Sequence, residues 1–362
     1  MFNFKKTYNL PFKYHIPNYI EDFYSQGNVL KRRIKFFKRS LYISLMGQRK
    51  LELFSILPSH QKILWINVSA PSIGDTLMDL SSRVLLNGRN IDLFTSQNTV
   101  EIYSNDKIFN RVYSSPELAA KNKYDLVIID SYSTRSMKIK LKIASKVNYI
   151  GMYGYFNGPE LNRVLFSFHQ MNNLLKYYYS ESSINKIAKP SITVSDFDLK
   201  LVKSLNLPNF FIAIVIGGEW EYRTYNKWSE VIDKLTKKNK KLNLVFVGSD
   251  NAKESAKDLT EAFPQDNIFN CVAKFTFNQT AQIIKGAKIL LCCDGGLMHA
   301  ANAVNTPIVP LFAKLIPTMR LTESIQAFPL FDANDVNNIT VEEIIEQYNE
   351  VSIYDDNHLL GE

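Results

Sequence analysis

The 362-residue sequence predicts an α/β protein made of two Rossmann-like domains whose parallel sheets face each other across a cleft. Short, almost continuous apolar segments alternate with helical patterns, as in parallel sheets that are covered on both faces. The alternation occurs in two series, and the expected linker between them is the segment 186–208, which contains Pro190 and Pro208. We therefore expect four parts: a basic helical N-terminal extension at 1–60, a Rossmann-like domain at 61–190, a second one at 191–330, and a C-terminal helix and tail at 331–362.

The N-terminal extension carries the basic character of the chain. Residues 1–60 hold eleven Lys and Arg against three Asp and Glu, a balance of +8 that equals the net charge of the whole chain. The spacing predicts a helix over 28–47 with an apolar stripe made of Leu30, Ile34, Phe37, Leu41 and Leu45. Much of the remaining helix surface is basic: Lys31, Arg32, Arg33, Lys35, Lys38 and Arg39.

Two interpretations of this helix stay open. Its apolar stripe can lie on an anionic membrane surface, with the basic side chains among the lipid headgroups. Alternatively, the stripe packs on the body of the protein and the charges are solvated, which is the commoner arrangement. Nucleic acid is not expected as a partner, because no motif that reads nucleic acid accompanies the charge.

Short apolar segments mark the expected strands. The first series contains Lys62–Val68, Ile91–Thr95, Tyr124–Asp130 and Val147–Met152. A helical stretch to Leu86 follows its first strand, and an irregular, aromatic-rich section extends from 153 to about Pro190. The second series contains the strands Phe210–Ile216, Leu242–Val247, Ile268–Val272, Ile289–Cys293 and Ile308–Phe312. Its helical patterns are Lys227–Lys238, Ala252–Ala262, Asn278–Gly286 and Leu297–Val304.

The composition indicates a reducing compartment. Cys271, Cys292 and Cys293 lie in apolar, strand-like segments, and an odd count with two adjacent residues predicts buried free thiols. No segment approaches the roughly 18 uninterrupted apolar residues of a membrane-spanning helix. The N-terminus also lacks the apolar segment of a signal peptide. We therefore expect a cytoplasmic protein.

The most informative junction joins the strand Ile289–Cys293 to the helix that follows it. Asp294 ends the apolar run, and Gly295 and Gly296 allow the backbone to turn tightly. The unpaired N–H groups at a helix start and the helix dipole favour an anion there. His299 lies in the same helix, where it is either a buried core residue or part of the site. The sequence therefore predicts a phosphate-binding site.

Another strand end carries a carboxylate. Gly74, Asp75 and Thr76 follow the first strand at a strand-to-helix turn. Asp75 is either the N-cap of the helix or a general base for an acceptor hydroxyl, and these residues alone favour the cap.

A third strand end carries cations. Gly217 and Gly218 follow the strand Phe210–Ile216, and Arg223 and Lys227 come within ten residues. These cations either hold a diphosphate or mark an exposed helix start. All three groups follow strands, and ligands of parallel α/β sheets bind at the carboxyl ends of strands, so the common position favours function.

At these residues the chain resembles glycosyltransferase family 9, the heptosyltransferase-like enzymes of bacterial lipopolysaccharide synthesis. Asp294-Gly295-Gly296-Leu297-Met298-His299-Ala300-Ala301-Asn302-Ala303, Thr306-Pro307-Ile308-Val309 and Leu311-Phe312 look like its D-[ST]-G-x-x-H-x-A-x-A…T-P-x-V-x-L-F-G signature. Ala273-Lys274-Phe275-Thr276, Lys227-Trp228 and Gly74-Asp75 are similar to further elements of the family. The resemblance covers residues 62–313 and is most specific in the C-terminal half.

The resemblance implies an inverting, metal-independent glycosyltransferase of the GT-B type with no separate cofactor. The donor would be a nucleotide sugar, by family default ADP-heptose, and the acceptor a lipopolysaccharide, a lipooligosaccharide or a related glycan. Asp75 would be the general base, with Gly74 and Thr76 on the acceptor side. On the donor side, Lys227 would contact the diphosphate, Gly295 and Gly296 would cradle it, and Asp294 and His299 would line the same pocket. Gly217, Gly218 and Arg223 join the expected donor-binding residues because of their position after the strand Phe210–Ile216.

The chain departs from the family pattern at several positions, among them the loop after Ala313 and the stretch after Gly74-Asp75. Gly295 stands where the family has Ser or Thr, and Ala313 replaces the glycine after Leu-Phe. The donor sugar therefore stays open between heptose and another sugar such as an N-acetylhexosamine. The alternative function is a catalytically silent homologue that binds a nucleotide sugar or a partner protein. A nicotinamide-dependent oxidoreductase is disfavoured, because no G-x-G-x-x-G follows a strand. The basic extension would hold the enzyme peripherally on the inner face of the bacterial inner membrane.

Overall fold

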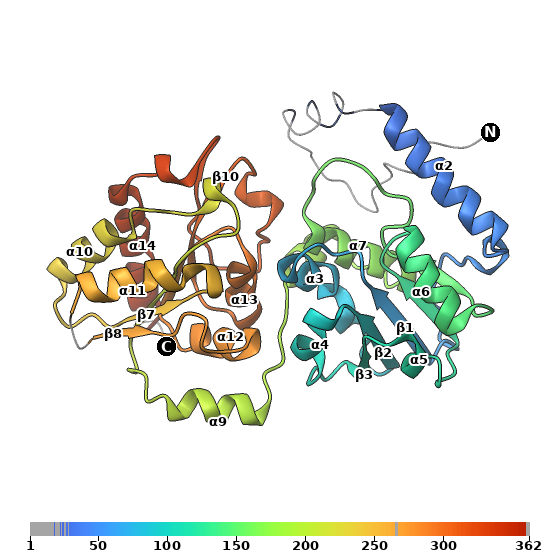
Figure 1. The fold of residues 1–362 in the computed structure, drawn as a ribbon, viewed down its shortest axis with the longest axis horizontal. Helices are drawn as coiled ribbons and strands as arrows, with labels where there is room; N and C mark the ends of the chain where they lie inside the picture. The colour runs from blue at the N-terminus through green and yellow to red at the C-terminus, as the bar shows by residue number, and fades with distance from the viewer. Residues whose placement is uncertain are drawn as a thin grey trace. The chain divides into compact units, whose positions relative to one another are not determined.

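The computed structural model describes residues 29–264 and 267–359, together with Asn18, Asp22, Tyr24 and Gly27. Contacts divide the chain into two compact units, Met1–Ala188 and Lys189–Glu362 (Figure 1). Asn28, at which the predicted helix begins, most of the extension before it and residues 360–362 of the predicted tail lie outside the described residues.

The first unit contains a parallel sheet of five strands in the order β3-β2-β1-β4-β5. The strands are β1 Lys62–Asn67, β2 Asn90–Thr95, β3 Phe109–Tyr113, β4 Leu126–Ile129 and β5 Tyr149–Gly151. The four strands predicted in this unit are confirmed, and the order 3-2-1-4-5 is typical of a Rossmann-like sheet. The edge strand β3 was missed because Asn110 and Arg111 in it are exposed and interrupt its apolar character.

Helices in the first unit differ more from the prediction. They are α2 Val29–Leu45, α3 Ile73–Asp79, α4 Gln97–Tyr103, α5 Pro116–Ala119, α6 Thr134–Ala144, α7 Arg163–Leu175 and α8 Glu181–Ile187. The helical stretch expected to reach Leu86 ends as an α-helix at Asp79, and a 3-10 helix Ser81–Leu86 follows. The irregular section expected to reach Pro190 is wrong, because α7 and α8 lie in it and pack on α3 through Val164, Ile184 and Met78.

The predicted basic helix is present as α2, but it packs with an unexpected side. Phe36, Ser40 and Ile43 are its buried residues, and the Phe36 ring lies 4.8 Å from the Tyr155 ring. Ile43 belongs to the core cluster that α6 shares with the sheet. The interpretation in which the stripe Leu30–Leu45 packs on the body is therefore wrong, because all five stripe residues are exposed.

The second unit contains a parallel sheet of six strands in the order β11-β10-β9-β6-β7-β8. The strands are β6 Ile212–Val215, β7 Leu244–Val247, β8 Ile268–Asn270, β9 Ile289–Cys293, β10 Ile308–Ala313 and β11 Leu330–Asp332. Read from β8, the order is 3-2-1-4-5-6, which again is typical of a Rossmann fold. The five predicted strands are confirmed. β11 was missed because it is short and only partly buried.

Helices in the second unit follow the prediction except at the linker. They are α9 Asp196–Ser204, α10 Trp228–Lys238, α11 Lys253–Ala262, α12 Phe277–Lys285, α13 Gly296–Val304 and α14 Val341–Leu359. The expected linker 186–208 is wrong in part, since α9 lies within it. Gln279 of α12 donates to the buried Asp198 of α9 at 2.8 Å, so this helix is fastened to the second unit.

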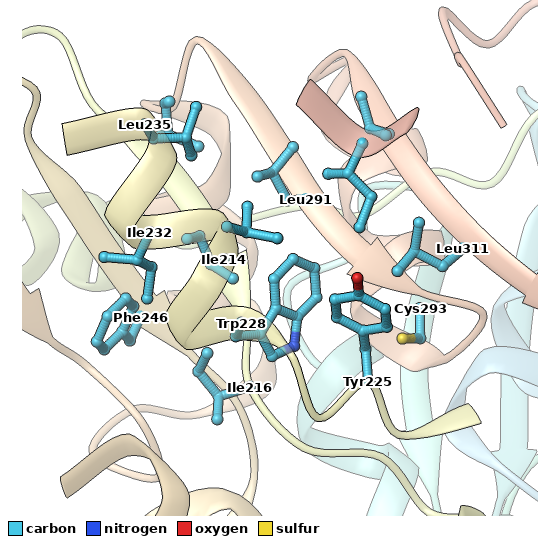
Figure 2. Close-up of a cluster of buried hydrophobic side chains, with 14 of the residues drawn as sticks. Ile214, Ile216, Tyr225, Trp228, Ile232, Leu235, Phe246, Leu291, Cys293 and Leu311 are labelled. Atoms are coloured by element: carbon cyan, nitrogen blue, oxygen red, sulfur yellow. The ribbon is translucent and has the colours of Figure 1, made fainter. Parts of the chain in front are cut away.

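The two faces of the second sheet are covered by different helices. Successive side chains of a strand point to opposite faces, so Ile214 packs with α10, α11 and α14, whereas Ala213 packs with α12 and α13. Figure 2 shows the first of these clusters, in which Trp228 and Tyr225 meet the strand side chains beside Cys293. Both faces of this parallel sheet are therefore buried, as the continuous apolar strands predict.

The three cysteines are buried and unpaired, which confirms the predicted free thiols. Across the described part of the chain, no helix combines the length and the apolar character needed to span a bilayer.

Candidate functional site

The first part of the candidate site begins where β1 gives way to α3. Ser72, not Asp75, is the N-cap of α3, because Ser72 has extended backbone angles and its Oγ accepts from the Asp75 N–H at 3.2 Å. The same Oγ donates to Asp75 Oδ2 at 2.7 Å. The interpretation of Asp75 as an N-cap is therefore wrong. Asp75 lies in the first turn of the helix, where its carboxylate is held by the capping serine.

Arg163 of α7 connects Asp75 to a second carboxylate. Its Nη1 lies 3.3 Å from Asp75 Oδ1, and its Nε and Nη2 contact Asp79 at 2.8 and 2.6 Å. Tyr153 also donates to Asp79 at 2.6 Å. Asp79 is buried, with a side chain 2% exposed, whereas the Asp75 side chain keeps 17% of its surface. Asp75 is thus the carboxylate of this pair that solvent reaches.

The surroundings of Arg163 favour its charged form. Burial lowers the pKa of Arg163, but the attraction of Asp79, Tyr153 and Asp75 outweighs it, so the pKa of Arg163 is raised well above its ordinary value. Burial and the Asp79 charge raise the pKa of Tyr153, so its hydroxyl stays a hydrogen-bond donor. The guanidinium is therefore a fixed cation beside Asp75.

The two residues expected beside Asp75 are turned inward. Gly74 and Thr76 are both buried in α3, and the Thr76 hydroxyl donates to the Ser72 carbonyl at 3.1 Å. Sequence reasoning missed Arg163 and Asp79. The one signal was the pair of carboxylates at i and i+4, which share a helix face.

The second part of the candidate site lies at the carboxyl ends of β6, β9 and β10. Asp294 follows β9, and its backbone N–H donates to the Leu311 carbonyl at 3.0 Å. Arg223 Nη1 donates to Asp294 Oδ2 at 3.0 Å, and Arg320 Nε lies 3.8 Å from the same oxygen. The Asp294 side chain is only 3% exposed. The structure thus brings together two predicted residues, Arg223 and Asp294, and adds Arg320.

A further cation joins this group through an aromatic ring. Tyr222 accepts from Arg223 at 3.2 and 3.3 Å, and Lys314 Nζ lies 3.8 Å from the centroid of the Tyr222 ring. Burial lowers the pKa of Arg223, but the charge of Asp294 and the Tyr222 hydroxyl raise it above its ordinary value overall. Within this group three cations, Arg223, Lys314 and Arg320, outnumber the one carboxylate of Asp294. We call these five residues the basic cluster: Tyr222, Arg223, Asp294, Lys314 and Arg320.

Gly217 and Gly218 shape the loop that carries Arg223. Gly217 has φ +84°, and a Cβ there would lie 2.8 Å from Ala252 Cβ. A Cβ on Gly218 would lie 2.5 Å from Thr224 Oγ1. Both positions therefore need glycine for packing, and the two glycines set the course of the backbone that carries Arg223.

Gly295 and Gly296 begin α13 and leave space around them. Gly295 is the N-cap, with extended backbone angles and no side-chain cap for the helix. A Cβ on Gly295 would meet the Cys293 carbonyl oxygen no closer than 3.9 Å, and one on Gly296 would meet Phe277 at 3.7 Å. The first N–H groups of α13 have no intrahelical acceptor, so they suit an anion.

The other two predicted donor residues are engaged elsewhere. Lys227 is the N-cap of α10, and its ammonium donates to the Asn337 carbonyl at 2.7 Å. His299 is buried within α13, one turn past Gly295, whose carbonyl accepts from its N–H at 3.4 Å. Sequence reasoning missed Lys314 and Arg320, which lie in the loop after β10. The one indication in the sequence was that the loop carrying them follows a strand.

Comparisons with known proteins agree with this architecture. Residues 162–327 match the model of Glycosyltransferase family 9 (heptosyltransferase), so the resemblance seen in the sequence is confirmed. No curated protein sequence matches the chain at a significant level.

Solved structures of this family have the same fold. A glycosyltransferase of family 9 from Veillonella parvula DSM 2008 superposes with a TM-score of 0.68 at 15% identity, covering 81% of this chain and 97% of its own. The ADP-heptose lipopolysaccharide heptosyltransferase II of E. coli gives 0.66 at 19% identity, covering 82% and 99%. The E. coli heptosyltransferase WaaC with ADP gives 0.58 at 15% identity, covering 80% and 98%. The expected GT-B fold class is therefore confirmed.

Proposed function

We propose that this chain, which carries a glycosyltransferase family 9 domain over residues 162–327, transfers a sugar from a nucleoside diphosphate to a glycan or glycolipid acceptor of the lipopolysaccharide type. The observation that carries the proposal is the basic cluster beside the start of α13, inside the region that matches the family. A diphosphate is the part of a nucleotide sugar that needs such a site.

The basic cluster suits the leaving group of glycosyl transfer. Negative charge grows on the diphosphate as the glycosidic bond breaks, and fixed cations stabilise that charge more than they stabilise the bound substrate. Arg223 and Arg320 are held by Asp294, so they need little reorganisation when the charge develops. The free N–H groups of α13 would add donors. We therefore propose transfer that does not require a metal ion.

Asp75 suits the acceptor side of the reaction. It is the accessible carboxylate of its pair, and Ser72 and Arg163 hold it in place. We propose that it removes the proton of the acceptor hydroxyl, which then attacks the anomeric carbon from the face opposite the diphosphate, with inversion. Arg163 is a positioning residue, because it acts through Asp75.

The donor is proposed as ADP-heptose. Support comes from the printed names of the E. coli enzymes: one is an ADP-heptose heptosyltransferase and the other was solved with ADP. Gly295 lacks the hydroxyl that Ser or Thr has at this position in the family, so a different donor sugar stays the alternative.

Within the part of the chain that the structure describes, no group of three His, Cys, Asp or Glu side chains is placed to hold a metal.

One experiment tests both the donor and the activity. A donor that binds the native state raises the free energy of unfolding, by about 2.7 kcal/mol at a hundred times its Kd. ADP-, UDP- and GDP-sugars are therefore tested for thermal stabilisation, and the best one for sugar transfer to a lipopolysaccharide acceptor with and without a chelator. Arg223→Ala should lose the stabilisation, whereas Lys257→Ala, at an exposed site on α11, should keep it. Stabilisation without transfer would favour the silent homologue, and loss of transfer with chelator would contradict metal independence.

A further inference from the structure

Helix α2 has a covered side and an exposed apolar side. The covered side consists of Phe36, Ser40 and Ile43, which are at most 8% exposed. The exposed side is the stripe found in the sequence, whose five residues keep between 41% and 74% of their surface: Leu30, Ile34, Phe37, Leu41 and Leu45. Single exposed apolar residues are ordinary, but five on one helix face form a surface that water solvates poorly.

Helix geometry shows that the two sides are distinct. Each residue of an α-helix turns by about 100°, so the five stripe residues fall within an arc of about 80°. The centre of that arc is about 130° from the centre of the buried side. The stripe therefore faces away from the contact that Ile43 makes with α6 and the sheet.

Basic side chains flank the stripe. Six of the 17 residues of α2 are Lys or Arg, and none is Asp or Glu. By the same geometry, Lys31, Lys35 and Lys38 fall on one flank of the stripe and Arg33 on the other, and all four are exposed. An apolar centre with cationic edges is the surface of a helix that lies in a membrane interface.

We propose that α2 docks the protein on an anionic phospholipid bilayer, with the stripe in the headgroup region and the lysines at the lipid phosphates. Charge selects this occupant among the alternatives. Two copies of α2 would bring like charges together, and nucleic acid offers nothing for the apolar centre. At 17 residues the helix is about 25 Å long, and it lies along the surface instead of crossing it.

Docking would bring the enzyme to lipid-linked acceptors. The inference nevertheless stands apart from the proposed function, because vesicle binding requires no sugar transfer. A chain that binds vesicles and transfers no sugar would contradict only the function. A chain that transfers sugar to a water-soluble acceptor and ignores vesicles would contradict only the docking.

Co-sedimentation of the full chain with vesicles tests the proposal. We expect binding to phosphatidylcholine vesicles that contain about 30% phosphatidylglycerol and little binding to phosphatidylcholine alone. Phe37→Ser with Leu41→Ser should weaken binding at least about tenfold. Lys35→Glu with Lys38→Glu should weaken it by about 25-fold or more, at roughly fivefold per cation removed.

Control variants outside α2 test whether vesicle binding depends on this helix. Phe197→Ser removes an exposed aromatic ring on α9, and Lys237→Glu with Lys257→Glu reverses two exposed charges of the second unit. Both should bind as the wild type does. Equal melting temperatures for all variants would exclude misfolding. Leu41→Trp adds a reporter, whose emission should shift to the blue with anionic vesicles, whereas that of Phe197→Trp should not.

Three results would overturn the proposal. The wild type could fail to sediment with anionic vesicles. The Phe37→Ser, Leu41→Ser variant could bind them as tightly as the wild type does. Finally, the wild type could form a dimer and bind no vesicles, and the variant could be a monomer. That result would mean that the stripe contacts a second copy of the chain.

Discussion

Arg163 holds the buried carboxylate of Asp79 with two hydrogen bonds of 2.8 and 2.6 Å while its third nitrogen lies 3.3 Å from Asp75. One guanidinium therefore fastens α7 to α3 and orients the carboxylate that solvent reaches. Its planar fork makes both contacts at once, which a lysine ammonium cannot reproduce.

Replacing Arg163 should affect stability and activity differently. Arg163→Ala leaves Asp79 buried without its cation and should cost about 3 kcal/mol of unfolding free energy. Arg163→Lys should cost less but still lower kcat about tenfold, with an unchanged donor KM, because Asp75 loses its fixed neighbour. Denaturant unfolding and kinetics measure both. Arg135→Ala, at an exposed site on α6, is the control and should stay within about 0.5 kcal/mol of the wild type. An unchanged kcat in Arg163→Lys would contradict the positioning role.

Asp75→Asn should separate catalysis from donor binding. The amide can still accept from Ser72, so the fold should persist, but it cannot take a proton from the acceptor. We expect kcat to fall by about 10²–10⁴ and thermal stabilisation by the donor to stay unchanged. Glu343→Gln is a matched control, because Glu343 has the same reciprocal contacts with the capping Thr340 at the start of α14. Wild-type transfer by Asp75→Asn would disprove its role as the base.

Gly295→Ser should be tolerated and should improve donor binding. The nearest heavy atom to a Cβ there is 3.9 Å away and the backbone is extended, so no strain is expected. Serine also caps a helix slightly better than glycine, by a few tenths of a kcal/mol. The added hydroxyl supplies the hydrogen-bonding side chain that the family has at this position, so KM for the nucleotide sugar should fall.

Gly217→Ser is the contrasting variant. Its positive φ and the 2.8 Å approach to Ala252 should cost about 2 kcal/mol or more of unfolding free energy. Calorimetry and donor titrations of the two variants give the comparison. If Gly295→Ser raises the donor KM, the bound donor occupies the space beside Gly295 and the prediction is wrong.

Stability should rise with pH because of Lys140. This lysine is buried, and burial lowers its pKa to about 8. Between that value and the unfolded pKa of about 10.4, the unfolded chain binds more protons than the folded one, so unfolding free energy increases with pH. The rise attributable to Lys140 should be about 2 kcal/mol between about pH 7 and about pH 9.5, out of about 3 kcal/mol in full. Unfolding of Lys140→Met and the wild type is compared from about pH 7 to about pH 9.5, where buried tyrosines have not yet ionised. Parallel curves for the two proteins would refute the prediction.

The sequence predicts the positions of most strands along the chain, but only part of the candidate site. Nine strands could be predicted because strands buried on both faces are continuous apolar segments. Arg163 could not be predicted, because α7 is buried around most of its circumference and its sequence therefore lacks the alternation of apolar and polar residues that marks a helix. Arg320 lies in a loop, where no period exists. The stripe of α2 was visible, but which side of the helix packs depends on the tertiary contacts of Phe36 and Ile43.

Among the described residues, the core clusters on the two sheets each draw on one unit: the sheet of the first unit packs with α5 and α6, and that of the second with helices from α9 to α14. The chain is therefore modular. The Asp75 pair lies in the first unit and the basic cluster in the second, so a substitution in the core of one unit need not disturb the residues of the other. Under the proposed function, donor preference and acceptor preference would therefore change independently during evolution, and we expect a chimera that exchanges Lys189–Glu362 with the corresponding half of a relative to keep both cores intact.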